Sequence, residues 1–144
     1  MIVTLAALAG VIGACGSNDS TGPDGPGDPN TSAAGVFTLT KVDSKSLPFT
    51  VLTDSFYTLE VTSGTAVLDT AGHFIMPLTT RETVAGHAST YVDTTRGTWL
   101  QAAGVITLTV QPGATSTTAA WDGRHLTVGF AIGTATNNYV YTRN

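Results

Sequence analysis

The chain has 144 residues, which is the size of one ordinary domain. Only 11% of the residues are charged, the formal net charge is −4, and there is a single cysteine. One cysteine excludes a disulfide framework, and together with three scattered histidines it supplies too few ligands for a zinc site. Six Lys and Arg against ten Asp and Glu is the reverse of the balance in nucleic-acid-binding proteins. We therefore expect no metal, no other cofactor and no nucleic-acid partner.

Residues 1–14 have the pattern of a secretory signal peptide. They are almost wholly apolar or small, and the run is too short to cross a hydrocarbon core of roughly 30 Å. The sequence Ile12-Gly13-Ala14-Cys15 then resembles the lipobox of bacterial lipoproteins. This resemblance implies that Cys15 carries a lipid and becomes the mature N-terminus, which anchors the protein to a membrane on the extracytoplasmic side. The alternative is a short buried strand or helix with an inert cysteine.

Residues 15–34 read CGSNDSTGPDGPGDPNTSAA. After the cysteine, every residue is small, polar, Gly or Pro, so the segment has no side chains from which to build a core. We expect a lipidated cysteine followed by a disordered tether that holds the domain away from the membrane. The folded domain then spans residues 35–144.

The domain alternates apolar and polar residues with a period of two, the repeat of a β-strand with one buried face. Thr is the usual polar partner, and the domain contains 24 of the 27 threonines. Because Thr is β-branched and uncharged, it suits the outer face of a strand and accounts for the low charge. The alternation predicts strands at 36–42, 47–51, 56–62, 65–69, 73–81, 91–101, 105–111, 117–122, 124–132 and 139–143.

Turn residues separate these strands. Asp122-Gly123 is the strongest hairpin signal, and Ser63-Gly64 predicts another turn. The spacing of about 8–12 residues per strand favours consecutive antiparallel hairpins, whereas parallel strands would need crossover helices. We expect an all-β domain, an antiparallel up-and-down meander that closes as a barrel of about eight strands. A β-sandwich is the alternative.

The order of landmarks resembles that of small bacterial lipocalin-like lipoproteins. The domain opens with Gly35-Val36-Phe37, similar to the Gly-x-Trp start of lipocalins, and Arg143 lies in its last strand. In lipocalins an Arg near the last strand covers the aromatic residue of the first. The resemblance therefore implies a lipocalin-like barrel that Phe37 and Arg143 close, with room for an apolar ligand and no catalytic residues.

The interior of such a barrel is either filled by side chains or just wide enough for one small ligand, and the sequence leaves both open. Trp99, Tyr57 and Tyr141 are the polar-tipped candidates, because a buried indole or phenol needs a hydrogen-bond partner. The residues expected to line a cavity are Phe37, Tyr57, Phe74, Trp99, Phe130 and Tyr141.

We expect no enzyme, because no catalytic constellation stands out. His87, in an expected loop at 85–89, could act as a base with Asp93, but no Gly-x-Ser-x-Gly nucleophile elbow is present. An unrecognised hydrolase is thus the minor alternative. The sequence favours a monomeric, membrane-tethered lipocalin-like lipoprotein of the cell envelope that binds a small apolar ligand. The other alternative is a protein-interaction module, an envelope inhibitor or adhesin-like sandwich, with an exposed aromatic patch near Trp121 or Tyr139.

Overall fold

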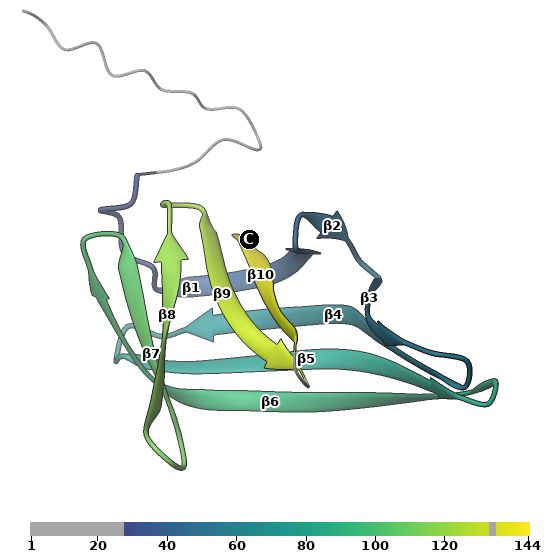
Figure 1. The fold of residues 1–144 in the computed structure, drawn as a ribbon. Coiled ribbons are helices and arrows are strands. Elements are labelled where there is room, and N and C mark those ends of the chain that lie inside the picture. Colours follow the sequence, from purple (N-terminus) through teal and green to yellow (C-terminus); the bar gives the residue numbers. More distant parts are fainter. Residues whose placement is uncertain (1–27, 133–134) are drawn as a thin grey trace, which may run out of the picture.

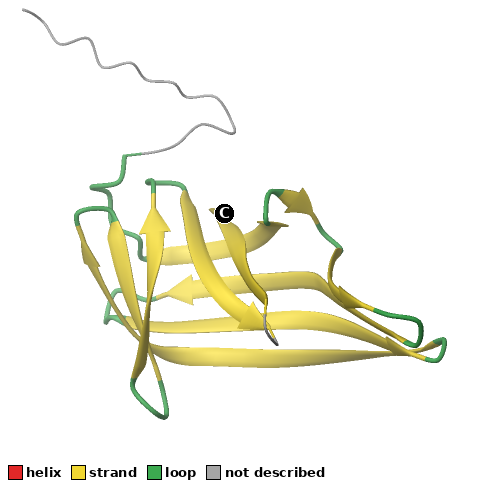
Figure 2. Ribbon diagram, viewed as in Figure 1, coloured by secondary structure: helices red, strands yellow, loops and turns green. Residues whose placement is uncertain are grey.

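The computed structural model describes residues 28–132 and 135–144, and every regular element in these ranges is a β-strand (Figures 1 and 2). The predicted signal peptide, Cys15 and the tether up to residue 27 lie outside the described residues. The strands are β1 (Gly35–Val42), β2 (Lys45–Ser46), β3 (Phe49–Thr53), β4 (Tyr57–Leu68), β5 (His73–Val84), β6 (His87–Ala102), β7 (Val105–Val110), β8 (Thr115–Trp121), β9 (His125–Ile132) and β10 (Ala135–Arg143).

Eight of these strands close into a barrel. Neighbours are hydrogen-bonded in the order β1-β10-β9-β8-β7-β6-β5-β4, and β4 pairs with β1 to complete the ring. All the pairs are antiparallel. β2 pairs with β1 and β3 with β4, so both lie outside the ring. The predicted all-β domain, an antiparallel up-and-down barrel of eight strands, is confirmed, and the sandwich alternative is wrong.

The barrel core is formed by the inward-facing member of each alternating pair. In β7, Ile106 and Leu108 are buried while Thr107 between them is partly exposed, and β9 repeats the pattern with Leu126 and Val128. Burial of each such side chain contributes about 1.5–3 kcal/mol relative to exposure, which fixes the register of the sheet. The other large buried apolar side chains are Phe37, Leu39, Val42, Val61, Leu68, Phe74, Met76, Trp99, Trp121, Tyr139 and Tyr141.

Trp121 and Tyr139 belong to this core. Trp121 is 3% exposed and Tyr139 is fully buried. The aromatic patch that the interaction-module hypothesis places near these residues is therefore not on the surface, and that expectation is wrong. Both residues occupy inward positions of their strands, where burial of a large ring is most favourable.

Gly64 lies inside a strand and not in a turn. β4 runs without interruption through Ser63 and Gly64, with a β-bulge where its register against β5 shifts. A Cβ on Gly64 would lie 3.1 Å from Leu78 Cδ1 and 3.2 Å from Leu39 Cδ2. The glycine thus makes room for two core side chains, and the predicted turn is wrong.

The long strands β4, β5 and β6 continue beyond the ring, alongside β3 (Figure 1). We call this extension the arm; it consists of β3 and of residues 57–61, 79–84 and 87–95. Because β7 pairs with β6 only from Gly97 onward, residues 87–95 pair with β5 alone in the described part of the chain. The arm therefore leaves one edge of β6 open and continues the inner surface of the barrel outward.

The hairpin between β5 and β6 turns at Ala85 and Gly86, which have φ angles of 49° and 84°. His87 is already the first residue of β6 and pairs with Val84. The loop predicted at 85–89 is thus a two-residue turn, and the strand begins four residues earlier than the alternation indicated.

Residues 28–34 pack onto one end of the barrel. Ala33 is fully buried in the core, and Trp121 Nε1 donates a hydrogen bond to the Thr31 carbonyl at 2.9 Å. The Gln101 side-chain amide donates to the same carbonyl at 2.8 Å, and its oxygen accepts from the Ala33 N–H at 2.8 Å. The prediction of a disordered tether is therefore wrong for these residues. The segment is held through its backbone, which requires no large apolar side chain.

Candidate ligand-binding cavity

The first and last strands of the barrel meet at Phe37 and Arg143, which are direct partners in the β1–β10 pair. The guanidinium carbon of Arg143 lies 5.5 Å from the centre of the Phe37 ring and 4.7 Å from that of Trp121. The two rings pack edge to face with centres 5.7 Å apart. Arg143 also donates hydrogen bonds to the carbonyls of Ser32 and Ala34. Arg143 thus covers the Phe37 ring and holds residues 28–34 against the barrel.

A cavity of about 390 Å³ lies where the arm meets the barrel, between β4–β6 on one side and residues of β9 and β10 on the other. Its volume falls within the roughly 300–1,000 Å³ that small-molecule sites occupy. The apolar part of its wall comes from four strands, β4, β5, β9 and β10, and lies mostly in the barrel, with Leu59 on the arm. The large residues of this wall are Leu59, Met76, Leu78, Phe130, Ile132 and Tyr141.

Two of the six residues expected to line a cavity, Phe130 and Tyr141, do line this one. The Tyr141 side chain is 1% exposed, and burial raises the pKa of its phenol well above the ordinary value of 10. Tyr141 is therefore neutral near pH 7 and adds an uncharged aromatic surface to the wall.

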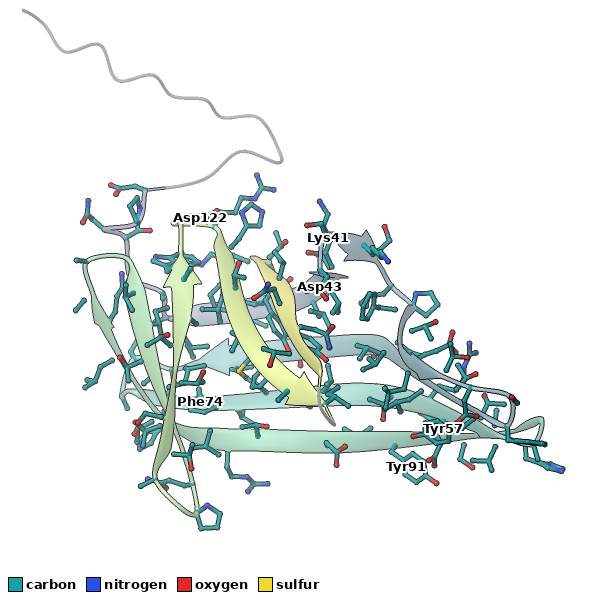
Figure 3. The ribbon with its side chains drawn as sticks, in the orientation of Figure 1. Lys41, Asp43, Tyr57, Phe74, Tyr91 and Asp122 are labelled. Carbon is teal, nitrogen blue, oxygen red and sulfur yellow. The ribbon has the colours of Figure 1, made fainter. Side chains whose placement is uncertain are left out.

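The other four expected residues lie elsewhere. Phe37, Phe74 and Trp99 pack in the core away from the cavity, and Trp99 Nε1 donates a hydrogen bond to the Asp69 carbonyl at 3.0 Å. Tyr57 lies on the arm, across the molecule from Phe74 (Figure 3). The interior is thus filled by large rings around Phe37 and Trp99, and the cavity lies where the arm begins.

The wall of the cavity on the arm side is polar, and none of its residues was among the six expected to line a cavity. Thr80 and Glu82 of β5 and Tyr91, Asp93 and Thr95 of β6 line it. Thr80 is 7% exposed and pairs with Tyr91 across the two strands. The cavity therefore has an apolar side set in the barrel and a polar side set on the arm.

His87 and Asp93 do not form the general-base pair that the hydrolase hypothesis needs. Both lie on β6, where His87 pairs with Val84 at the tip of the arm and Asp93 pairs with Leu78 nearer the barrel. Six residues of extended strand separate them by roughly 20 Å. Their side chains are too far apart to share a proton, so the hypothesis of that pair is wrong.

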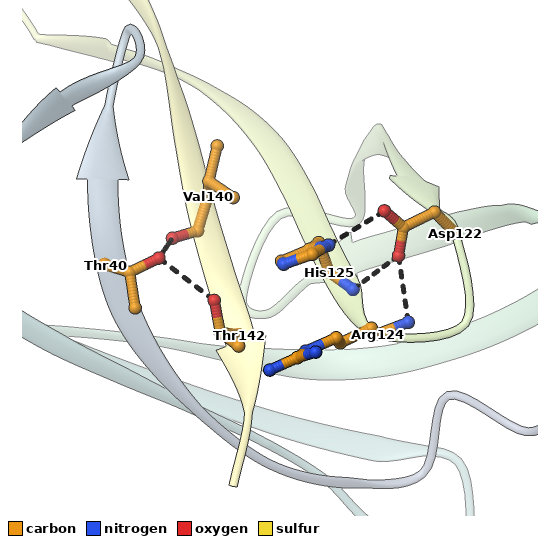
Figure 4. Close-up of polar contacts among 6 residues, drawn as sticks. All are labelled: Thr40, Asp122, Arg124, His125, Val140 and Thr142. Carbon is orange, nitrogen blue, oxygen red and sulfur yellow. Dashed lines mark hydrogen bonds and ion pairs between the residues drawn. The ribbon is translucent and has the colours of Figure 1, made fainter. Parts of the chain in front are cut away.

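A second hollow, of about 430 Å³, lies on the outer face of the barrel beside the turn between β8 and β9. Asp122 Oδ2 lies 2.9 Å from His125 Nδ1, while Asp122 Oδ1 accepts hydrogen bonds from the Arg124 and His125 N–H groups at 2.9 and 2.6 Å (Figure 4). The Thr40 and Thr142 hydroxyl oxygens lie 3.0 Å apart on the same face. The Asp122 carboxylate thus fixes the predicted Asp-Gly turn and orients the imidazole.

This carboxylate gives the fold a defined acid sensitivity. Burial raises the pKa of Asp122, but the hydrogen bonds from His125 and Arg124 outweigh it and hold the pKa below the ordinary 3.8. Because the pKa is lower in the folded state, the ionised group stabilises the fold above about pH 4, and this contribution is lost as the pH falls through the folded-state value. We expect Asp122→Ala to lower the free energy of unfolding by about 1 kcal/mol at pH 6 and by less at about pH 2.5. Urea unfolding at the two pH values measures the difference; an equal loss at both would contradict the role of the charge.

Within residues 28–132 and 135–144, no three His, Cys, Asp or Glu side chains gather as a metal site requires. The described residues also contain no helix long and apolar enough to cross a membrane. No family model matches the chain, and we found no match among curated proteins or solved structures. The geometry of the cavity is therefore the basis on which a function is inferred.

Proposed function

We propose that the protein is a membrane-tethered, non-enzymatic binding protein of the cell envelope, and that the cavity at the base of the arm holds one small apolar molecule. The observation that carries the proposal is the apolar wall of this cavity, formed by inward-facing residues such as Met76, Phe130 and Tyr141. An eight-stranded barrel has room for one such ligand. Each CH₂ group removed from water contributes about 0.8 kcal/mol, so several methylenes bind without any specific polar contact.

The tether is supported by the sequence, through the apolar residues 1–14 and the lipobox-like Ile12-Gly13-Ala14-Cys15. Residues 28–34 join the barrel on the side away from the arm (Figure 1). The structure is compatible with attachment to a membrane on this side. A protein attached through the preceding residues would therefore keep the mouth of the cavity clear of its point of attachment.

Binding is tested with N-phenyl-1-naphthylamine, a neutral apolar probe whose fluorescence rises when it leaves water. We expect saturable binding to a single site. Leu59 lines the cavity and is only partly buried, so Leu59→Trp has space to place its larger ring in the hollow. This variant is expected to bind the probe at least about tenfold more weakly, because the volume for the ligand is lost.

Leu100→Trp is the matched control, since the same substitution falls on β6 at a side chain that is 77% exposed and does not line the cavity. Its affinity for the probe is expected to equal that of the unaltered protein. An unaltered protein that fails to bind the probe, or a Leu59→Trp variant that binds it as tightly as Leu100→Trp, would overturn the proposed site.

The anchor is tested in a bacterial host that is fed a radioactive fatty acid. We expect the label on the protein, the protein in the membrane fraction, and both lost in Cys15→Ser because serine has no thiol to acylate. Retention of the protein on membranes without Cys15 would contradict a lipid anchor at this residue.

A further inference from the structure

The polar wall of the cavity is an ordered ladder of cross-strand pairs. From the barrel towards the tip of the arm, Leu78 pairs with Asp93, Thr80 with Tyr91, and Glu82 with Ser89. Directly opposed residues in an antiparallel pair share one face of the sheet, and diagonal neighbours lie about 7–8 Å apart. The Tyr91 ring therefore lies between the carboxylates of Asp93 and Glu82. Each carboxylate belongs to the neighbouring pair on the same face of the sheet.

The charged residues of this polar wall are acidic. Glu82 and Asp93 line the cavity, and among the described residues no Lys, Arg or His does so. The arginine nearest in sequence, Arg81, points to the opposite face, where its Nη2 and Nε lie 2.6 and 2.9 Å from Glu60 Oε2. The two carboxylates of the cavity are thus left without a cationic partner in its lining.

Aromatic rings accompany the carboxylates. Tyr91 is 50% exposed, so the ring is accessible to a ligand from the cavity mouth. Tyr57 pairs with Val84, two residues along β5 from Glu82, and burial and the Glu82 carboxylate raise the pKa of its phenol. Figure 3 shows Tyr57 and Tyr91 on the same part of the arm. A cation over an aromatic face beside carboxylates is attracted by both.

We propose that the cavity selects amphiphiles that carry a positive charge, with the apolar chain against Met76, Phe130 and Tyr141 and an ammonium group over Tyr91 between Glu82 and Asp93. This inference rests on the proposed binding function and specifies its ligand class, an alkylamine type of molecule. An amphiphile of the same chain length with a neutral head group gains no electrostatic attraction at this position. An anionic head group is repelled by the two carboxylates.

The test is displacement of bound N-phenyl-1-naphthylamine by decylamine, decanol and decanoate at pH 7, the two ions below their micelle concentrations and decanol below its solubility limit. The three share one chain length and differ in head-group charge. We expect decylamine to displace the probe at about one tenth of the decanol concentration, and decanoate to be the weakest competitor, because a cation–π contact and partly exposed ion pairs each contribute modestly. The advantage of the amine is expected to shrink in about 0.5 M salt, which screens exposed charges.

The variants Glu82→Gln and Asp93→Asn keep the shape of each side chain and remove its charge. We expect each to reduce the preference for decylamine over decanol, and the double variant to bring it below about twofold. Glu60→Gln is the control, because it removes the same charge from the opposite face of the arm and is expected to keep the full preference.

The outcomes separate the two proposals. If the unaltered protein binds the probe but shows equal affinity for amine and alcohol, the charge selectivity is overturned and the binding function stands. If Glu60→Gln lowers the preference for decylamine as much as Glu82→Gln does, the charge selectivity is also overturned. The attraction would then come from the overall net charge and not from the cavity. Failure of the unaltered protein to bind the probe overturns the binding function and this inference together.

Discussion

Gly97→Ala is expected to lower the free energy of unfolding by about 3 kcal/mol or more and to prevent closure of the barrel. A Cβ at this position would lie 1.9 Å from the Thr109 carbonyl oxygen and 2.8 Å from its carbon. These are backbone atoms of the neighbouring strand, so no side-chain rotation relieves the clash. The third contact, 3.0 Å to Phe74 Cε1, is with a buried ring. β7 would have to move away from β6 where the ring and the arm join.

Urea unfolding, followed by the circular dichroism of the sheet, measures the effect. Gly129→Ala is the matched control, because Gly129 also lies within a strand and its added Cβ would meet nothing closer than 3.9 Å. That variant is expected to be unchanged or slightly more stable, since alanine loses less backbone entropy on folding. Similar stabilities for the two variants would show that β6 and β7 do not approach as closely as described.

The alternation of apolar residues with Thr was sufficient to predict the strands and their inward faces, because each strand has one buried and one exposed face. Phe37 and Leu39 in β1 and Leu126 and Val128 in β9 are inward as their spacing indicates. The signal is local, since it needs only the identity of residues two apart. It predicts which face of a strand is buried, whatever the strand later pairs with.

Glycine positions were less predictable, because a glycine serves either to turn the chain or to make room for a neighbour. Gly123, with a φ of 93°, is in a turn as the Asp-Gly sequence predicts. Gly64 instead accommodates Leu39 and Leu78, which are distant in sequence and adjacent only in the closed sheet. The two uses look alike in a single sequence, and only the tertiary neighbours distinguish them.

The polar half of the cavity illustrates a second limit. The alternation that places Phe74, Met76 and Leu78 on the inner face continues to Thr80 and Glu82. The period of two therefore predicts that Thr80 and Glu82 face the same side as these apolar residues. They were not predicted as cavity residues because only large apolar or aromatic side chains were considered. How far the strand extends beyond the ring depends on pairing with β6, which the sequence does not show directly.

Residues 28–34 were missed for a related reason. They contain no large apolar side chain, and their contacts are made by backbone groups to Gln101 and Trp121. Hydrogen bonds to backbone carbonyls require no particular residue on the accepting side. A segment attached in this way is indistinguishable in sequence from a disordered linker, although Ala33 is buried in the core.

Phe37→Ala is expected to lower the free energy of unfolding by about 3–5 kcal/mol, because the fully buried ring leaves a void that the barrel cannot collapse to fill. The loss includes the edge-to-face contact with Trp121 and the packing beneath the Arg143 guanidinium. Both contacts join the first strand to the last, so the void opens at the closure of the ring. Urea unfolding midpoints measure the change. Phe56→Ala, at a ring that is 76% exposed in the loop between β3 and β4, is expected to change stability by less than about 0.5 kcal/mol.

A milder change at the same position separates core packing from ligand contact. Phe37→Leu keeps most of the apolar volume, so its destabilisation is expected to be about half that of Phe37→Ala and the barrel remains folded. Because Phe37 does not line the cavity, this variant is expected to bind N-phenyl-1-naphthylamine with unchanged affinity. A large loss of probe binding in a folded Phe37→Leu protein would instead place the ligand deep in the barrel, next to the ring that Arg143 covers.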